Sequence, residues 1–249
     1  MSPKLKPLYH AGDKMKEKVK EYAARLFILF IGLTVAHLGV TLFLLSDMGA
    51  DPFNVLIQGL HNIIAGTFSD RITHGTVHIA VSFIIIVILL ITDKSYIKAG
   101  TVVCMICGGP IIDFFNFLLA GLHIRDMPAA GKTAVLILGC VILAFGMTIV
   151  IRSEAGTGPN DLVAVVMSEK LRKRFGRVRI IVDCVFVAAG ALLGGIFGKG
   201  TMICAYLVDP AADISMPLSA RLVSFGLRVM KVPQDTADKD INDTKEEET

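Results

Sequence analysis

The sequence predicts an all-α fold: a polytopic membrane helical bundle with about six spanning helices and two short broken or re-entrant helices, built from two internal repeats. Three observations support this prediction. The 249 residues are 53% hydrophobic with a mean hydropathy of +0.65, and only 19% are charged, against roughly 25% in an average soluble domain. Uncharged stretches as long as a bilayer is thick recur along the chain, and the two halves share a set of matching residues. This composition excludes a disordered chain, a disulfide-stapled secreted domain and an ordinary cytosolic enzyme.

Two stretches carry no Asp, Glu, Lys or Arg over the length of a membrane crossing: residues 26–45 and residues 133–151. At about 1.5 Å per residue, each reaches across a hydrocarbon layer roughly 30 Å thick. Three further spans are expected at residues 75–92, 100–122 and 180–198, and a weaker sixth begins at Gly200. In lipid these segments must be helices, because each backbone polar group needs an internal hydrogen-bond partner.

The charged residues gather outside these stretches. Residues 1–25 hold seven Lys or Arg and three acidic residues, and residues 168–179 hold six Lys or Arg and one Glu. Basic excess marks cytoplasmic segments, so we expect both of these on the cytoplasmic side. The chain is therefore divided into a basic juxtamembrane segment (1–25), membrane repeat 1 (26–122), membrane repeat 2 (133–218) and an acidic, solvated, disordered tail (233–249).

The internal repeat is the most informative pattern. At an offset of 107, five residues of the first half match five of the second, and Gly75, Val77, Ile79 and Val81 match their counterparts at an offset of 101. At an offset of 100, the pattern Gly-Thr-x2-Cys-x5-Pro-x2-Asp occurs at residues 100–113 and again at residues 200–213. The five pairs at the first offset are Gly32/Gly139, Gly39/Gly146, Thr41/Thr148, Gly49/Gly156 and Pro52/Pro159.

Each repeat contains a Gly/Pro turn followed by a short helix, at residues 52–65 and 159–171. Thirteen or fourteen helical residues reach only about 20 Å, which is less than a full crossing. Two topologies stay open on the sequence alone. If the short helices turn back, each repeat crosses three times and the repeats are inverted; if they cross, each repeat crosses four times and the repeats are parallel. Length favours the inverted arrangement.

The two turns supply the candidate solute-binding residues. The N-terminus of a half-helix presents free N–H groups and the positive end of a dipole, and polar side chains there add ligands. The candidates are Gly49, Asp51, Pro52, Asn54, Gly156, Pro159, Asn160 and Asp161. An equally simple reading is that the Asp and Asn residues are helix caps at a membrane interface.

Two further carboxylates are candidates for ion coupling. Asp113 and Asp213 occupy matching positions, three residues after Pro110 and Pro210, in segments expected to lie in the membrane. Ionisable groups at membrane depth usually face a cavity or a partner, although a place at the headgroup level would also explain both. Asp183 lies four residues after Arg179, which predicts a local ion pair.

The sequence shows no catalytic signature, and we expect neither an enzyme nor a cofactor. Zinc-protease, phosphate-loop and Gly-x-Ser-x-Gly patterns are missing. The five cysteines all lie in membrane segments and read as small apolar residues rather than metal ligands. The basic segments flank spans without interleaved aromatic residues, so the lipid bilayer is a better partner than nucleic acid.

The doubled unit resembles the YczE/YitT-type bacterial integral membrane proteins. The resemblance covers about residues 24–218 and is carried by residues 49–56, residues 156–162, and the Gly-Thr pairs at 100–101 and 200–201. It is nearer to the YczE branch than to the YitT branch, which has a Gly-Gly turn and an added soluble domain. The resemblance implies a multi-pass protein of the bacterial cell membrane, and it carries over no catalytic or substrate residue.

Two functions remain open at this point. The repeat and the broken helices favour a small secondary transporter or permease for a small polar or anionic solute. The alternative is a non-transporting scaffold or accessory protein that holds a membrane partner through the basic loop 168–179 and the charged tail. A homo-oligomer is compatible with either function.

Overall fold

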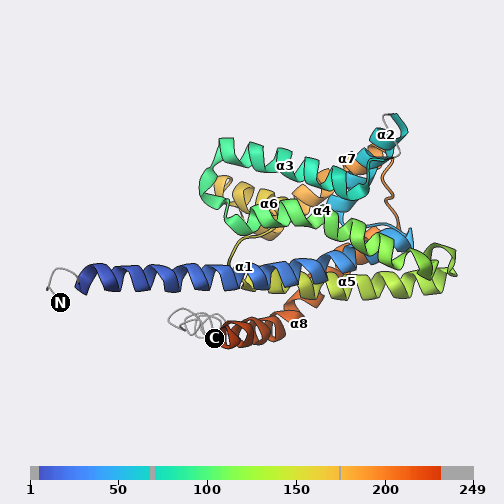
Figure 1. Cartoon of the computed structure of the whole chain (residues 1–249). Helices are drawn as coiled ribbons and strands as arrows, with labels where there is room; N and C mark the ends of the chain where they lie inside the picture. The colour runs from blue at the N-terminus through green and yellow to red at the C-terminus, as the bar shows by residue number, and fades with distance from the viewer. Residues whose placement is uncertain (1–5, 68–70, 174, 231–249) are drawn as a thin grey trace.

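The computed structural model describes residues 6–67, 71–173 and 175–230, and all regular secondary structure within them is helical (Figure 1). The acidic tail at 233–249 lies outside these residues. The α-helices are α1 (Lys6–Ser46), α2 (Pro52–Thr67), α3 (His74–Thr92), α4 (Ala99–Leu119), α5 (Ala129–Arg152), α6 (Pro159–Lys170), α7 (Phe175–Leu192) and α8 (Lys199–Val229). Three short 3-10 helices lie in the connections: η1 (Lys94–Tyr96), η2 (Ala120–Leu122) and η3 (Ile124–Asp126).

Four of the described helices are long and apolar enough to cross a membrane: Met15–Ser46 within α1, α3, Ala99–Leu122, and α5. Their outward faces carry large apolar side chains in positions that a soluble protein would fill with polar ones, such as Ile91 (83% exposed) and Phe117 (85% exposed). α7 carries two Arg and one Asp in its first nine residues. α8 has a shorter apolar part, Lys199–Val208.

α1 and α5 form the centre of the bundle and run antiparallel. A Cβ atom at Gly39 would lie 2.5 Å from the backbone nitrogen of Leu143, and one at Gly146 would lie 2.2 Å from the nitrogen of Ala36. From the Ala36–Gly146 contact to the Gly39–Leu143 contact, the residue number rises on α1 and falls on α5, so the two helices are antiparallel. Glycine is needed at both crossings, because any side chain would push the two backbones apart.

α4 packs on α1 and runs parallel to it, since Gly100 contacts Leu29 and Gly108 contacts His37. α3 and α4 form a hairpin in which Gly75 meets Gly109 at the end remote from the connection. α3 is therefore antiparallel to α1. The end of α1 and the start of α3 consequently lie at the same end of the bundle, with α2 between them (Figure 1).

Several helix boundaries differ from those expected. α1 begins at residue 6 rather than near residue 26, so the basic segment continues the first span as one helix of 41 residues. α8 continues as a helix through Pro210 and Pro217 for 31 residues. α4 likewise contains Pro110 without a break. The two short helices match the expectation closely: α2 has 16 residues and α6 has 12.

Candidate functional site

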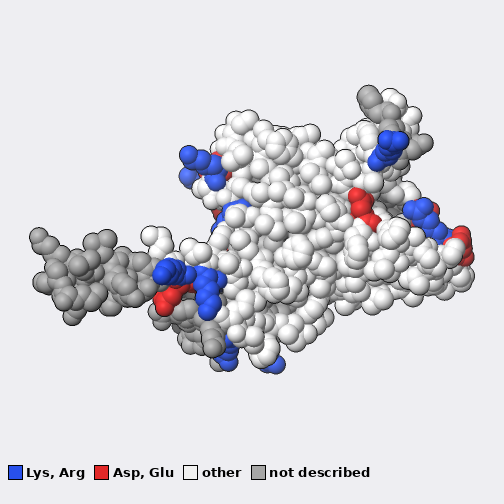
Figure 2. All heavy atoms as spheres, viewed as in Figure 1, with Lys and Arg blue, Asp and Glu red and all other residues white. Residues whose placement is uncertain are grey.

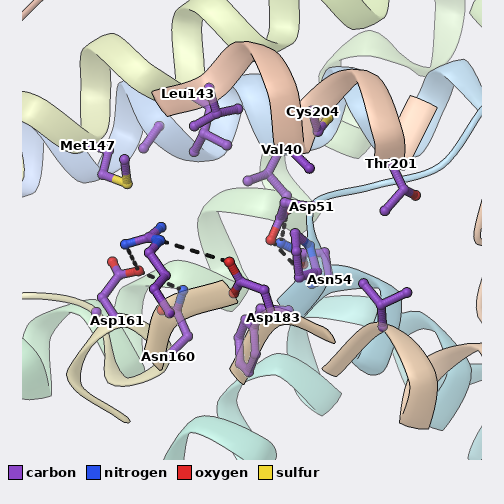
Figure 3. Close-up of a pocket in the computed structure, with 18 of the residues that line it drawn as sticks. Val40, Asp51, Asn54, Leu143, Met147, Asn160, Asp161, Asp183, Thr201 and Cys204 are labelled. Atoms are coloured by element: carbon purple, nitrogen blue, oxygen red, sulfur yellow. Dashed lines mark hydrogen bonds and ion pairs between the residues drawn. The ribbon is translucent and has the colours of Figure 1, made fainter. Parts of the chain in front are cut away.

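A cavity of about 970 Å³ lies between the two short helices and the central helices. α1 and α5 line it with Leu33, His37, Val40, Leu143 and Met147, and α8 lines it with Thr201 and Cys204. Both Gly/Pro turns also reach it. Figure 3 shows Asp51 and Asn54 at one wall and Asn160 and Asp161 at another.

The chain folds back into the bundle after α1. The Ser46 hydroxyl donates a 2.7 Å hydrogen bond to the carbonyl of Phe43. Asp47 (φ 56°) and Gly49 (φ 125°) then adopt left-handed backbone conformations, and only glycine adopts the second one readily. Because Asp51 shares the cavity with His37 and Val40 of α1, α2 begins beside the middle of the bundle rather than at the end of α1.

The second turn repeats this construction. The Ser153 hydroxyl donates to the carbonyl of Val150 at 2.6 Å. Glu154 (φ 56°) and Gly156 (φ 145°) are the left-handed residues. α6 then starts at Pro159, whose missing N–H costs nothing at a first helical position. Two turns with the same backbone path therefore start the two short helices.

Each turn is held by the helix start of the opposite half. The Gly200 amide at the start of α8 donates to the carbonyl of Met48 at 2.9 Å, and the Gly100 amide of α4 donates to the carbonyl of Ala155 at 3.0 Å. The approach is close, because a Cβ at Gly49 would lie 2.5 Å from Thr201 Oγ1. The Gly-Thr pairs that open α4 and α8 are therefore parts of the two turns.

The start of α2 is capped by its own carboxylate. Asp51 Oδ2 accepts from the Asn54 backbone N–H at 3.3 Å, and Oδ1 accepts from the Asn54 side-chain amide at 2.8 Å. His74 Nε2 donates to Asn54 Oδ1 at 3.0 Å. A hydrogen-bonded chain thus runs from the start of α3, through Asn54, to a carboxylate in the cavity wall.

The start of α6 has a different arrangement. Its N-cap, Gly158, offers no side-chain acceptor. Asp161 accepts from the Asn160 side chain at 3.3 Å and pairs with Arg179 of α7 at 3.4 Å. Arg179 also pairs with Asp183 at 3.9 Å, which is the local ion pair predicted from their spacing. One guanidinium thus lies between two partly buried carboxylates in the cavity wall and favours the charged form of both.

Two histidines complete the first half of the wall. His37 and His78 have ring centroids 5.7 Å apart, and His78 also lies edge-on to Phe53 at 5.4 Å. Within the described part of the chain, His78 Nδ1 and Thr201 Oγ1 are buried and have no hydrogen-bond partner. Both residues line the cavity. Buried polar atoms without partners are uncommon in proteins, and these two atoms lie in the packed wall behind the cavity surface.

The structure brings five of the candidate binding residues to the cavity: Asp51, Pro52, Asn54, Asn160 and Asp161. Gly49 and Gly156 lie behind them, packed against the starts of α8 and α4, and Pro159 is buried as the first residue of α6 without lining the cavity.

Asp113 and Asp213 are placed elsewhere. The Asp113 carboxylate accepts from the Thr73 hydroxyl at 2.6 Å and from the Gly75 amide at 3.1 Å, so it holds the start of α3. Asp213 is exposed on α8. Neither lines the cavity.

Sequence reasoning gave no binding role to Arg179, Asp183, His37 or Thr201, all of which line the cavity. A signal existed for Arg179, because it matches the position of His78 at the offset of 101 in the sequence. For metals, no group of three or more His, Cys, Asp or Glu side chains among the residues with described positions is arranged to hold an ion.

Comparison with known proteins places this arrangement in a family. A model described as "Family of unknown function (DUF6198)" matches residues 23–217. The chain belongs to this family. The match includes both turns, both short helices and nearly all of the cavity-lining helices.

Relatives of the DUF6198 chain include two proteins of Bacillus subtilis (strain 168). It is 25% identical over 209 residues to the uncharacterized membrane protein YczE, covering 84% of this chain and 93% of the relative. It is 23% identical to the uncharacterized protein YyaS, covering 77% and 92%. An uncharacterized protein of Haemophilus influenzae is 24% identical, covering 78% and 84%. No solved structure matches. The predicted resemblance to YczE-type membrane proteins is confirmed.

Proposed function

We propose that this DUF6198 protein is a small secondary transporter of a small polar or anionic solute, and that the solute binds between the starts of α2 and α6. The observation that carries the proposal is that two broken helices begin at the walls of one cavity deep in a membrane bundle. In secondary transporters, interrupted helices commonly form the solute site near the bilayer midplane.

Matched contacts support an inverted duplication. Counterparts in the two halves make the same interactions: the Ser46 and Ser153 hydroxyls, the left-handed Gly49 and Gly156, and the amides of Gly100 and Gly200. The first helices of the two halves, α1 and α5, are antiparallel. An inverted repeat of three crossings, together with a helix that turns back, accounts for both facts.

The six crossings of this proposal are α1, α3, α4, α5, α7 and α8. α7 carries Arg179 and Asp183, which face the cavity rather than lipid. Charges inside a membrane are tolerated where they pair and line a cavity. Apolar side chains of α7 that do not line the cavity are exposed, as Ile181 (60% exposed) and Val185 (58% exposed) show.

The distribution of basic residues supports a cytoplasmic N-terminus. Arg25 of α1 pairs with Glu154 at 2.7 Å, and Lys98 donates to the Glu154 carbonyl at 3.2 Å. Lys170 donates to the Thr92 carbonyl at 3.0 Å. The basic end of α1 and the start of the 168–179 loop therefore lie at one end of the bundle. Most charged side chains in Figure 2 lie near the ends of the molecule, with a largely uncharged band between. Basic excess marks the cytoplasmic end.

Reconstitution tests the proposal. Liposomes containing the purified protein are loaded with a mixture of small polar metabolites, and protein-dependent efflux of each is measured. Ala188→Trp places a large ring in the cavity wall and should block efflux. Ala80→Trp, on an exposed face of α3 away from the cavity, should not.

Two results would contradict transport: no protein-dependent flux of any solute, or flux that Ala188→Trp leaves unchanged in a folded protein. A partner that co-purifies stoichiometrically, together with absent flux, would favour the accessory role instead. Pro52→Ala and Pro159→Ala test the turns themselves, because both prolines begin the short helices.

A further inference from the structure

We infer that the cavity binds a solute that carries a positively charged amine, and that Asp51 is the residue that receives the amine. This inference rests on the proposed function in one respect, namely that the molecule bound in the cavity is the one carried. It narrows the solute class from polar or anionic molecules to amines.

The three carboxylates of the cavity wall differ in their partners. Asp161 and Asp183 both pair with Arg179. In the part of the chain that the structure describes, the Asp51 carboxylate accepts hydrogen bonds only from Asn54. Among the described residues, no Lys, Arg or His side-chain nitrogen lies within 4.0 Å of the Asp51 carboxylate oxygens. The part of the cavity wall at the start of α2 therefore contains a carboxylate, that of Asp51, with no protein cation paired to it.

A partly buried carboxylate costs free energy unless a cation or strong donors compensate it. Two hydrogen bonds from one neighbour, at 3.3 and 2.8 Å, leave acceptor capacity on both oxygens. The same cavity is lined by neutral or weakly polar groups, among them His37, His78, Phe53 and Cys204. It is also lined by two cations of α7, Arg177 and Arg179, and neither of them pairs with Asp51. An ammonium group supplies the charge and the donors that this wall lacks.

The same carboxylate argues against an anion at this turn. Asp51 already occupies the backbone N–H at the start of α2, where an anionic solute group would otherwise bind. An anion would also meet the negative charge of Asp51 directly. The dipole of α2 is thus used to hold the carboxylate in place, and the carboxylate presents negative charge to the cavity.

The size of the cavity points to an organic cation rather than a bare ion. About 970 Å³ is far more than the roughly 30 Å³ that one water molecule occupies in the liquid, and it is typical of small-molecule sites. Most of the wall is apolar, with Leu33, Val40, Leu143 and Met147 among its members. The Asn160 side chain, which also lines the cavity, offers an additional polar contact.

Three four-carbon probes that differ only in charge test the inference: n-butylamine, n-butyrate and n-butanol, each at about 10 mM and neutral pH with the detergent-solubilised full chain. Melting is followed with a thiol-reactive dye, which detects Cys104, Cys140 and Cys204 as these buried thiols become exposed on unfolding. We expect n-butylamine near saturation to raise Tm by about 2–4 °C, and butyrate, butanol and added Na⁺ to leave it unchanged.

Asp51→Asn should abolish the shift with n-butylamine, whereas Asp126→Asn, an exposed carboxylate outside the cavity, should retain it. A second measurement needs no variant. Cys184 is exposed and lines the cavity, so n-butylamine, but not butyrate, should slow its alkylation in the wild-type chain.

Equal stabilisation by butyrate, butanol or Na⁺, or a shift that survives in folded Asp51→Asn, would overturn the inference. The two proposals fail separately. Amine binding without flux of any amine in proteoliposomes would remove transport and leave the amine site. Flux of carboxylates without amine binding would remove the amine site and leave the transport proposal.

Discussion

Gly146 shows how closely single residues determine this structure. Its Cα faces the Ala36 nitrogen so tightly that a methyl group there would lie 2.2 Å from it, whereas a methyl group at Gly66 would have no neighbour within 4 Å. The two glycines serve different purposes. The first permits two central helices to cross, and the second only loosens the end of α2.

Gly146→Ala should therefore destabilise the protein, because α1 and α5 must separate to accept the new methyl group. Overpacking of this kind costs about 1–3 kcal/mol, which should lower Tm by several degrees. Gly66→Ala is the matched control and should leave Tm unchanged or raise it slightly, since alanine favours the helix. Equal Tm values for the two variants would contradict the packing described for α1 and α5.

Arg179 holds two carboxylates of the cavity wall, at 3.4 Å and 3.9 Å. Arg179→Gln should lower Tm, because Asp161 and Asp183 would then repel each other in a partly buried place. Adding Asp161→Asn should recover part of the loss, since it removes one of the two like charges. A double variant no more stable than Arg179→Gln alone would show that the ion pairs contribute little.

The short helices α2 and α6 are the elements on which the functional argument depends. α1, α3 and α4 run in alternating directions, and α2 connects two ends at the same face of the bundle. The chain enters the bundle as the extended turn before α2 and leaves it as α2, so it returns to the end of the bundle at which α1 ended. This path allows the start of the helix to face a cavity.

Accessibility of single cysteines tests this path in a background without native cysteines. Lys16→Cys and Ser95→Cys should react with an impermeant thiol reagent from one side of the membrane, and Arg71→Cys from the other. If α2 crossed the bilayer instead, Arg71→Cys would react from the same side as Lys16→Cys and Ser95→Cys would change sides. All three positions are exposed.

The elements also show what the sequence could and could not predict. The matching residues identified both turns and both short helices, because a turn needs particular residues at particular places. The ion-coupling role expected for Asp113 came from its depth and from its match with Asp213, and it stays a prediction. Depth along a helix does not give the direction of a side chain, and the Asp113 carboxylate accepts a hydrogen bond from Thr73 and does not line the cavity. The ends of α1 and α8 were underestimated, since polar residues end an apolar pattern without ending a helix.

For the whole molecule, the proposed topology of six crossings with a cytoplasmic N-terminus places the start of α1 and the end of α8 at the same face of the membrane. A green fluorescent protein fused after the C-terminus should therefore fluoresce, because it folds in the cytoplasm, and an alkaline phosphatase fused at the same place should be inactive. The opposite result from both reporters would require an odd number of crossings or an external N-terminus.

The exchange of hydrogen bonds between the halves has a consequence for how this protein is made. The carbonyl of Met48 can accept its hydrogen bond only after Gly200, more than 150 residues further along the chain, has been synthesised. The amide of Gly100 likewise needs the carbonyl of Ala155. When only the first half has been synthesised, its turn lacks the Gly200 amide that donates a hydrogen bond to it. Neither half is then a self-sufficient folding unit, and two separately expressed fragments should be degraded unless both are present in the same cell.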